Sequence, residues 1–348
     1  MKSNITSLWR RLSAVAVVAV AGTAGSVHAM TPASSVTLVP MSVLDGTSYH
    51  LDTLRSRIHM PTPCSSDKIG NKVMPEERDS FWMSYVGGYN RFAGDAAHPA
   101  DYARSFQGLL LGLDRQLCCN SLVGIAFGYE ESISRTAGAR MDNDTYFIDM
   151  YAAMRTGCWN HRMSVGVGIH DISTGRGFDW LGSTSGGADA HSINLGYELS
   201  RDYRINERTV ATPFMMINYG FSHYDSLHES IGPHEIASSF DDQNLLQIGI
   251  GGRMACDFNI VSGWEDATLT TSLAGVVEFS EHRASGKQTF MGESSRVSSM
   301  KREPFYGQLG FDLSMPMPND WVVQAGVFGR LGPDRAGVAG NVGLQCDF

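Results

Sequence analysis

The sequence predicts an all-β membrane protein, a 12-stranded antiparallel up-and-down transmembrane β-barrel with one short N-terminal helix. Three observations predict this fold. Apolar side chains recur at every second position from about residue 79 onward, which is the period of a β-strand. After the N-terminal leader, no run of 18 or more apolar residues offers a membrane-spanning helix. Glycine is abundant, at 38 residues, and charged residues make up only 18% of the chain, which suits the crowded interior of a barrel.

The first 29 residues form a predicted secretory signal peptide. Basic residues Lys2, Arg10 and Arg11 precede an apolar stretch at 12–21, and a small-x-small cleavage pattern ends at Ala29. We therefore expect export and cleavage after Ala29. Cleavage leaves 24 basic and 36 acidic side chains, a net charge of −12. A chain with this charge is not expected to bind nucleic acid.

Residues 30–78 form a short N-terminal segment that does not alternate like the strands. Ser48 is a candidate helix cap, and apolar residues follow it at helical spacing as far as Ile58. Prolines at 61 and 63 would end this helix. A helix over 48–58 would be about 16 Å long, half of the roughly 30 Å hydrocarbon thickness of a membrane. The pattern by itself therefore favours a surface helix.

Residues 79–348 form the predicted barrel domain. Twelve segments with a period of two are expected at residues 79–92, 104–117, 121–134, 143–156, 161–172, 189–201, 208–222, 241–256, 266–281, 302–314, 320–330 and 335–348. The clearest ones, 123–130 and 163–170, set Val, Ile, Met and aromatic residues against Gly, Ser and polar residues. A soluble protein would need a second layer to cover twelve such apolar faces. The sequence offers no such layer, so lipid is the expected cover.

The connections between the segments alternate between short and long. Short turns are predicted near residues 118–120, 157–160 and 316–319, whereas 173–188, 223–240 and 282–301 read as long polar loops. Short turns at one end and long loops at the other are typical of outer-membrane barrels. We therefore expect both barrel termini at the periplasmic end and the long loops outside the cell.

The last segment ends on an aromatic residue at the carboxy terminus. Its apolar face consists of Ala336, Val338, Gly340, Val342, Leu344, Cys346 and Phe348. This arrangement resembles the C-terminal assembly signal of bacterial outer-membrane barrels, and the resemblance assigns Val342, Leu344 and Phe348 to that signal.

Four further stretches resemble the translocator domain of autotransporters, the proteins of type V secretion. They are FWMSYVGGY at 81–89, GLLLGLD at 108–114, LVGIAFGY at 122–129, and DTYFIDMY at 144–151, the last followed by Gly157-Cys158-Trp159. The resemblance covers about 79–348. It implies a 12-stranded barrel in the outer membrane of a Gram-negative bacterium, with an α-helix threaded through the lumen just before the first strand. Residues 48–58 match that helix.

The resemblance also implies partners. These are outer-membrane lipid, the barrel assembly machinery and periplasmic chaperones, and we expect a monomer. In the family, the barrel carries an N-terminal passenger to the cell surface. Here only about fifty residues separate Ala29 from the barrel, without the repeats of a β-helical passenger. Two functions therefore stay open: a translocator barrel that anchors or displays its short N-terminal segment, and a passive pore or structural barrel.

No catalytic, cofactor or metal site is expected. His223, His228 and His234 share one loop with acidic residues, but their spacing is that of solvated loop histidines rather than metal ligands. His170, Asp171 and Ser173 lie in one strand, where adjacent residues point to opposite faces, so they are not expected to form a catalytic relay. The predicted lumenal charges either select ions or hold the helix, and they are Asp114, Glu130, Asp149, Glu198, Arg253, Glu278, Asp312 and Arg330.

Six cysteines are unexpected in such a barrel. The strand order places all of them at the periplasmic rim, where disulfides persist. Cys256 lies alone on the far side. For the others, neighbouring strands predict that Cys64 pairs with Cys346 or Cys118, and that Cys119 pairs with Cys158. Non-reducing peptide mapping of the purified barrel decides between these bridges and six free thiols.

The terminal strand generates the first testable prediction. Deleting Phe348 or introducing Leu344→Asp is expected to cause degradation or periplasmic accumulation of the protein. For Leu344→Asp the reason is that a charge on the lipid face costs about 1–4 kcal/mol, depending on depth. Immunoblots of outer-membrane fractions measure the effect. Normal outer-membrane levels of both variants would count against the assignment.

Overall fold

The computed structural model describes residues 38–58, 79–95, 101–118, 120–178, 182–231, 234–259, 266–280, 283–290, 293–317 and 320–348. The predicted cleavage site at Ala29 and two of the cysteines, Cys64 and Cys119, lie outside these residues.

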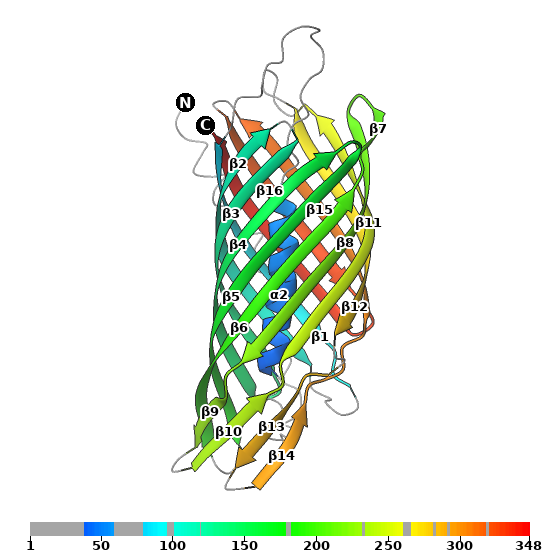
Figure 1. The fold of residues 1–348 in the computed structure, drawn as a ribbon. Helices are drawn as coiled ribbons and strands as arrows, with labels where there is room; N and C mark the ends of the chain where they lie inside the picture. Colours follow the sequence, from blue (N-terminus) through cyan, green and yellow to red (C-terminus); the bar gives the residue numbers. More distant parts are fainter. Residues whose placement is uncertain are drawn as a thin grey trace, which may run out of the picture.

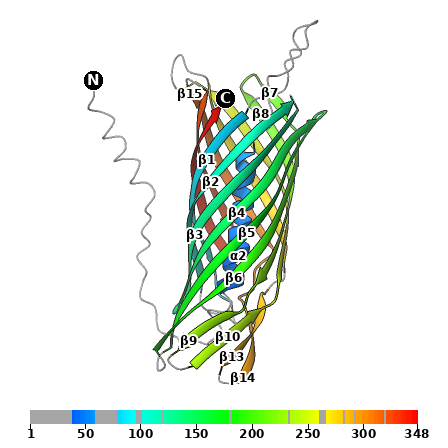
Figure 2. The same ribbon diagram turned by 60° about the vertical axis from the view of Figure 1, so that its left-hand side comes forward.

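Within the described residues, twelve antiparallel strands close into one barrel around a single helix, as the sequence predicts (Figures 1 and 2). The barrel strands are β1 (Asp79–Phe92), β2 (Tyr102–Cys118), β3 (Ser121–Thr136), β4 (Ala139–Thr156), β5 (Trp159–Phe178), β6 (Gly182–Ser200), β8 (Thr209–Tyr224), β11 (Gln243–Phe258), β12 (Ala267–Ser280), β15 (Phe305–Met317), β16 (Trp321–Leu331) and β17 (Arg335–Asp347). Each pairs with the next in this order.

The first and last strands close the barrel. β1 and β17 pair without interruption from Ser80 opposite Asp347 to Phe92 opposite Arg335. The ladder continues one residue further, because the Phe348 amide donates to the Asp79 carbonyl at 2.9 Å. Closure leaves no free edge in the barrel wall, which is the condition for a sheet to cross a lipid bilayer.

The two ends of the barrel differ. The end that holds Asp79 and Phe348 is called the turn end here, and it also carries the short strand β7 (Tyr203–Asn206). The opposite end is the loop end. There β9 (Leu227–Ile231), β10 (His234–Phe240), β13 (Ser285–Phe290) and β14 (Glu293–Ser298) extend the sheet from the tip of β6 beyond the barrel (Figure 1).

The prediction of a long loop at 173–188 is wrong. β5 continues to Phe178 and β6 begins at Gly182, so most of this stretch is strand. The buried Glu229 of β9 holds the two tips together, since it forms an ion pair with Arg176 and accepts a hydrogen bond from Thr184 at 3.2 Å. These tips lack an apolar face, and so the alternation that marks the rest of both strands is missing.

The predicted alternation places side chains as expected along the strands. On β3, Val123 and Phe127 are exposed on the outside whereas Ala126 and Glu130 are buried. On β5 the outward Val167 is 46% exposed, and the next inward polar residue, His170, is 1% exposed. The outer surface is therefore an apolar band for lipid, and the polar residues line an occupied lumen.

The occupant is helix α2, which spans Leu38–Arg57 and runs along the barrel axis (Figure 2). The predicted helix at 48–58 is therefore too short by about half. Its 20 residues correspond to about 30 Å, the thickness of the hydrocarbon core. No helix in the described part of the chain has both the length and the hydropathy of a membrane-spanning helix.

Local sequence explains why the first half of α2 escapes prediction. Pro40 lies in the first turn, where the missing amide hydrogen costs nothing. Gly46 lies mid-helix because the wall is close, and an added Cβ would be 3.0 Å from Arg104 Nη2. All but two residues of the helix are buried, some against apolar and some against polar residues of the wall, so α2 is not amphipathic.

The described cysteines lie at the turn end, as the strand order predicts. Cys118 is the last residue of β2, and Cys158 lies in the turn between β4 and β5. In this structure the thiols of Cys158, Cys256 and Cys346 are free. Bridges that involve Cys64 or Cys119 stay predictions.

A glycine in the wall generates the second prediction. An added Cβ at Gly112 would overlap the indole ring of Trp82, whose Nε1 donates to Tyr151 at 2.8 Å. Gly112→Ala is therefore expected to destabilise the barrel by about 1–3 kcal/mol through overpacking. Gly252→Ala is the matched control, because a Cβ at Gly252 meets open space. The temperature at which the folded band disappears on semi-native gels measures both, and equal midpoints would contradict the prediction.

Candidate functional site: the helix-filled lumen

The first turns of α2 form an apolar seal at the loop end. Leu38, Val39, Met41 and Val43 of the helix are fully buried there. They belong to one cluster with residues of the wall and of the chain before β15, namely Phe92, Tyr102, Ala139, Met141, Ile172, Ala190, Tyr224 and Met300. A plug of this kind excludes water from one end of the lumen.

A polar layer follows the seal, one turn further along α2. Asp45 accepts a hydrogen bond from Asn90 Nδ2 at 2.7 Å and lies 3.5 Å from Arg104 Nη1. Arg104 also forms an ion pair with Glu130, and both residues are buried. Because burying an unpaired charge is costly, the helix carboxylate and the wall guanidinium stabilise one another's position.

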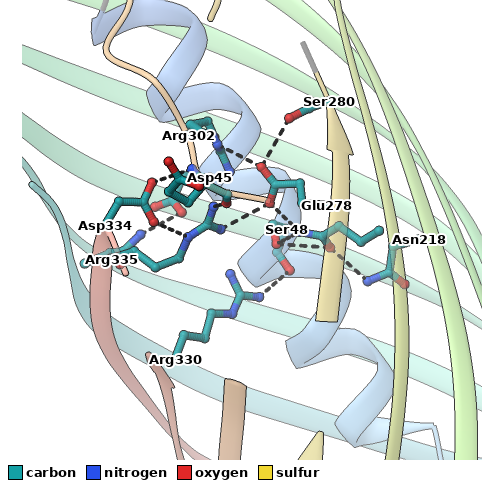
Figure 3. A network of polar contacts seen from close by, with 12 residues as sticks. Asp45, Ser48, Asn218, Glu278, Ser280, Arg302, Arg330, Asp334 and Arg335 are labelled. Atoms are coloured by element: carbon teal, nitrogen blue, oxygen red, sulfur yellow. Dashed lines mark hydrogen bonds and ion pairs between the residues drawn. The ribbon is translucent and has the colours of Figure 1, made fainter. Parts of the chain in front are cut away.

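Arg330 of β16 binds the middle of the helix. Its guanidinium donates to the Ser48 carbonyl at 3.0 Å (Figure 3). The same guanidinium forms an ion pair with Asp52. It also lies over the Tyr49 ring, 3.8 Å from the centroid, a cation–π geometry. One wall residue thus contacts three positions of α2, and it fixes both the rotation and the height of the helix.

His50 contacts the opposite side of the lumen. Its Nε2 lies 2.8 Å from Asp149 Oδ2, within hydrogen-bonding distance, and its ring stacks on Phe147 with centroids 3.7 Å apart. Together with Arg330, these contacts hold α2 between β4 and β16.

Arg57, the last residue of α2, binds the seam between the first and last strands. Its Nη2 donates to Ser84 Oγ on β1 at 2.8 Å and to Asn341 Oδ1 on β17 at 2.7 Å. Gly343 makes room for it, since a Cβ there would lie 2.9 Å from the guanidinium. The helix end therefore joins both strands of the closure from inside.

Residues 299–303, between β14 and β15, fold back over the loop end of the lumen. Ser299, Met300 and Arg302 are all buried. Arg302 Nε lies 2.8 Å from Glu278 Oε1, and Arg335 Nη1 lies 3.1 Å from the other oxygen of the same carboxylate (Figure 3). This segment covers the helix seal and is held by the barrel wall.

The geometry fixes the direction of the chain through the barrel. Leu38 lies at the loop end and Ile58 lies with Trp82 toward the turn end, where β1 begins. The chain therefore enters α2 at the loop end and leaves it toward the turn end.

The lumenal charges that the sequence singles out differ in what they contact. Asp149 and Arg330 bind the helix directly, and Glu130 does so through Arg104. Glu198, Arg253 and Glu278 pair with other wall residues or with 299–303. Asp114 instead accepts hydrogen bonds from Ser80, Trp82 and Tyr151. Arg104, Asp45, Asp52 and Arg57 were not singled out from the sequence. For Arg104 the available signal was a charge on the inward face of β2, between Tyr102 and Phe106.

Three of the histidines that the sequence analysis weighed, His170, His223 and His228, have structural partners, whereas the side chain of His234 lies outside the described part of the structure. His170 contacts Thr145 Oγ1 and Ser192 Oγ, each at 3.0 Å, and no relay with Ser173 exists. His223 pairs with Asp242 and His228 with Glu235. Among the described residues, no group of three or more His, Cys, Asp or Glu side chains has the geometry to hold a metal ion.

The Arg330–Asp52 ion pair generates the third prediction. Arg330→Met leaves the buried Asp52 with fewer partners and is expected to destabilise the barrel by about 3–5 kcal/mol, the usual cost of breaking a buried pair. The double variant Arg330→Met/Asp52→Leu is expected to recover part of that loss. Urea unfolding of the refolded barrel measures both variants and the single variant Asp52→Leu, with the exposed Arg204→Met as control. Strictly additive losses would contradict a direct interaction.

The fold is similar to that of solved autotransporter barrels. The translocator domain of NalP from Neisseria meningitidis matches with a TM-score of 0.68 at 13% identity, over 90% of this chain and 99% of that one. The β-domain of BrkA from Bordetella matches with a TM-score of 0.62 at 13% identity, over 78% and 99%. The transport unit of AIDA-I from Escherichia coli matches with a TM-score of 0.56 at 11% identity, over 90% and 99%.

A family comparison supports the same assignment from sequence. No curated protein matches the chain. The model of the autotransporter β-domain, however, matches residues 81–327, which is most of the chain and nearly all of the barrel. The chain therefore belongs to the autotransporter β-domain family of type V secretion, and its barrel resides in the outer membrane of a Gram-negative bacterium.

Proposed function

We propose that this barrel is a translocator that anchors its own short N-terminal segment at the cell surface. The observation that carries the proposal is the direction of α2. The helix begins at Leu38 inside the apolar seal of the loop end, and it leads to β1, which begins at the turn end.

The orientation of the barrel in the membrane determines on which side the chain before α2 lies. The turn end faces the periplasm in an outer-membrane barrel with both termini on that side, so the loop end is extracellular. The chain that precedes Leu38 then leaves the lumen on the outside. On this proposal, residues 1–29 are removed as the signal peptide, 30–78 form the displayed segment with its lumenal helix, and 79–348 form the barrel domain.

Assembly of the barrel is the second part of the proposal. The terminal strand presents Val342 and Phe348 on the outer surface, 59% and 72% exposed, with Leu344 on the same face. This face is available to the barrel assembly machinery, after delivery by periplasmic chaperones. Complete pairing of β1 with β17 in one chain supports a monomer.

A passive pore is the alternative function, and the contacts of α2 argue against it. The apolar seal and residues 299–303 close the extracellular end of the lumen, and polar contacts on two sides, the Arg330–Asp52 ion pair and the His50–Asp149 hydrogen bond, hold the helix in place. A barrel that works by conduction needs a continuous aqueous path.

The fourth prediction concerns the location of the N-terminal segment. An epitope tag inserted directly after Ala29 is expected to bind antibody on intact cells, because the chain before Leu38 would lie outside. The same tag inserted between Asn206 and Arg208, at the turn end, is the control and is expected to react only after permeabilisation. Labelling of both tags only in permeabilised cells would contradict surface display.

A further inference from the structure

α2 does not fill the lumen evenly. Beside its last two turns lies a cavity of about 420 Å³, bounded by Asp52, Arg55 and Arg57 of the helix. On the wall side it is lined by β8, β11, β12 and β15, and it reaches Asp202 and Thr268 at the turn end. The seal and residues 299–303 lie at the other end of the barrel, so the cavity belongs to the periplasmic half.

Two arginines on the wall of the cavity share one carboxylate. Arg162 and Arg253 each donate from Nη1 to Glu198 Oε1 at 2.8 Å. Glu198 is almost fully buried, whereas the two guanidinium groups are about one fifth exposed. A carboxylate neutralises one guanidinium, so this triad presents a surplus positive charge on its cavity side.

On the helix side of the cavity, two arginines again share one carboxylate. Asp52 forms ion pairs with both Arg55 and Arg330. Arg57 donates to the neutral side chains of Ser84, Gln324 and Asn341. Asp312, which also lines the cavity, attracts Arg57 but is not close enough to form an ion pair with it.

The charges around the cavity do not balance. Among the described residues, the lining side chains and their ion-pair partners comprise six guanidinium groups and four carboxylates, namely Arg55, Arg57, Arg155, Arg162, Arg253, Arg330, Asp52, Glu198, Asp202 and Asp312. The C-terminus of α2 adds only a partial negative charge. Two buried donors, Arg57 Nε and Arg162 Nε, have no acceptor in the described chain.

We propose that this cavity is a binding site for a small multivalent oxyanion of the phosphate class, taken up from the periplasmic side. Guanidinium forks match phosphate oxygens in geometry and charge, and the surrounding threonine and serine hydroxyls can donate to the remaining oxygens. The site is separate from the anchoring of the N-terminal segment, so either assignment stands without the other.

The experiment uses the full exported chain, folded in zwitterionic detergent at low salt, with inorganic pyrophosphate as the probe. Isothermal titration calorimetry is expected to show one site per barrel, with an affinity that falls as sodium chloride is added, because salt screens the interaction. Gel mobility without heating confirms that each sample is a folded barrel.

Three variants separate a binding site from a structural cluster. Arg253→Gln removes a cavity donor and is expected to weaken binding by about tenfold or more, as for the loss of a charged hydrogen bond. Asp312→Asn removes a competing carboxylate and is expected to strengthen binding. Arg204→Gln, an equal change of charge on the exposed strand β7, is expected to leave the affinity unchanged.

The increase with Asp312→Asn is the decisive result, since a purely structural role for the arginines predicts no gain. The proposal is overturned if the folded wild-type barrel binds no pyrophosphate at low salt. It is equally overturned if Arg253→Gln and Arg204→Gln bind alike, which would mean that the anion meets only the general charge of the surface.

Discussion

The structure depends on one constraint: the lumen of this barrel is buried and yet polar, so charges there must be paired without free access to water. The wall provides Arg104, Asp149 and Arg330, and α2 provides Asp45, His50 and Asp52 as their partners. Each pair costs desolvation and recovers it only with good geometry. The pairs therefore contribute more to the position of the helix than to the net stability of the barrel.

The same constraint connects the helix to barrel closure. Arg57 contacts β1 and β17 from inside, at the seam where the only non-sequential strand pairing of the twelve-stranded wall is made. Gly343 leaves space at this point of β17, because an added Cβ would lie 2.7 Å from the Met83 carbonyl oxygen and 2.9 Å from the guanidinium. The terminal strand thus has two faces with separate tasks: its outer face carries the proposed assembly signal, and its inner face receives the helix.

The strands of the wall could be predicted from sequence, because each has one side facing lipid and one facing the lumen. Apolar and polar residues therefore alternate along it at a period of two. Predicted and observed strands such as 79–92 agree closely. The prediction failed where a segment does not have one lipid-facing and one lumen-facing side. The tips of β5 and β6 beyond Thr174 and before Ala188 have no lipid-facing side, so they lack the alternation. Helix α2 is buried on nearly all sides, against apolar wall residues at some positions and polar ones at others, so its first half has no one-sided apolar stripe. The pairing of particular charges depends on register across several strands, which no local pattern contains. Asp52 and Arg330, for example, are 278 positions apart.

The central claim is that α2 closes the barrel by filling its extracellular half. Planar-bilayer recordings of the full exported chain and of a variant that lacks residues 38–58 test this claim most directly. The account predicts little or no ion current through the full chain, and stable open channels once the helix is removed. Equal currents through the two proteins, with both confirmed as folded barrels, would contradict it.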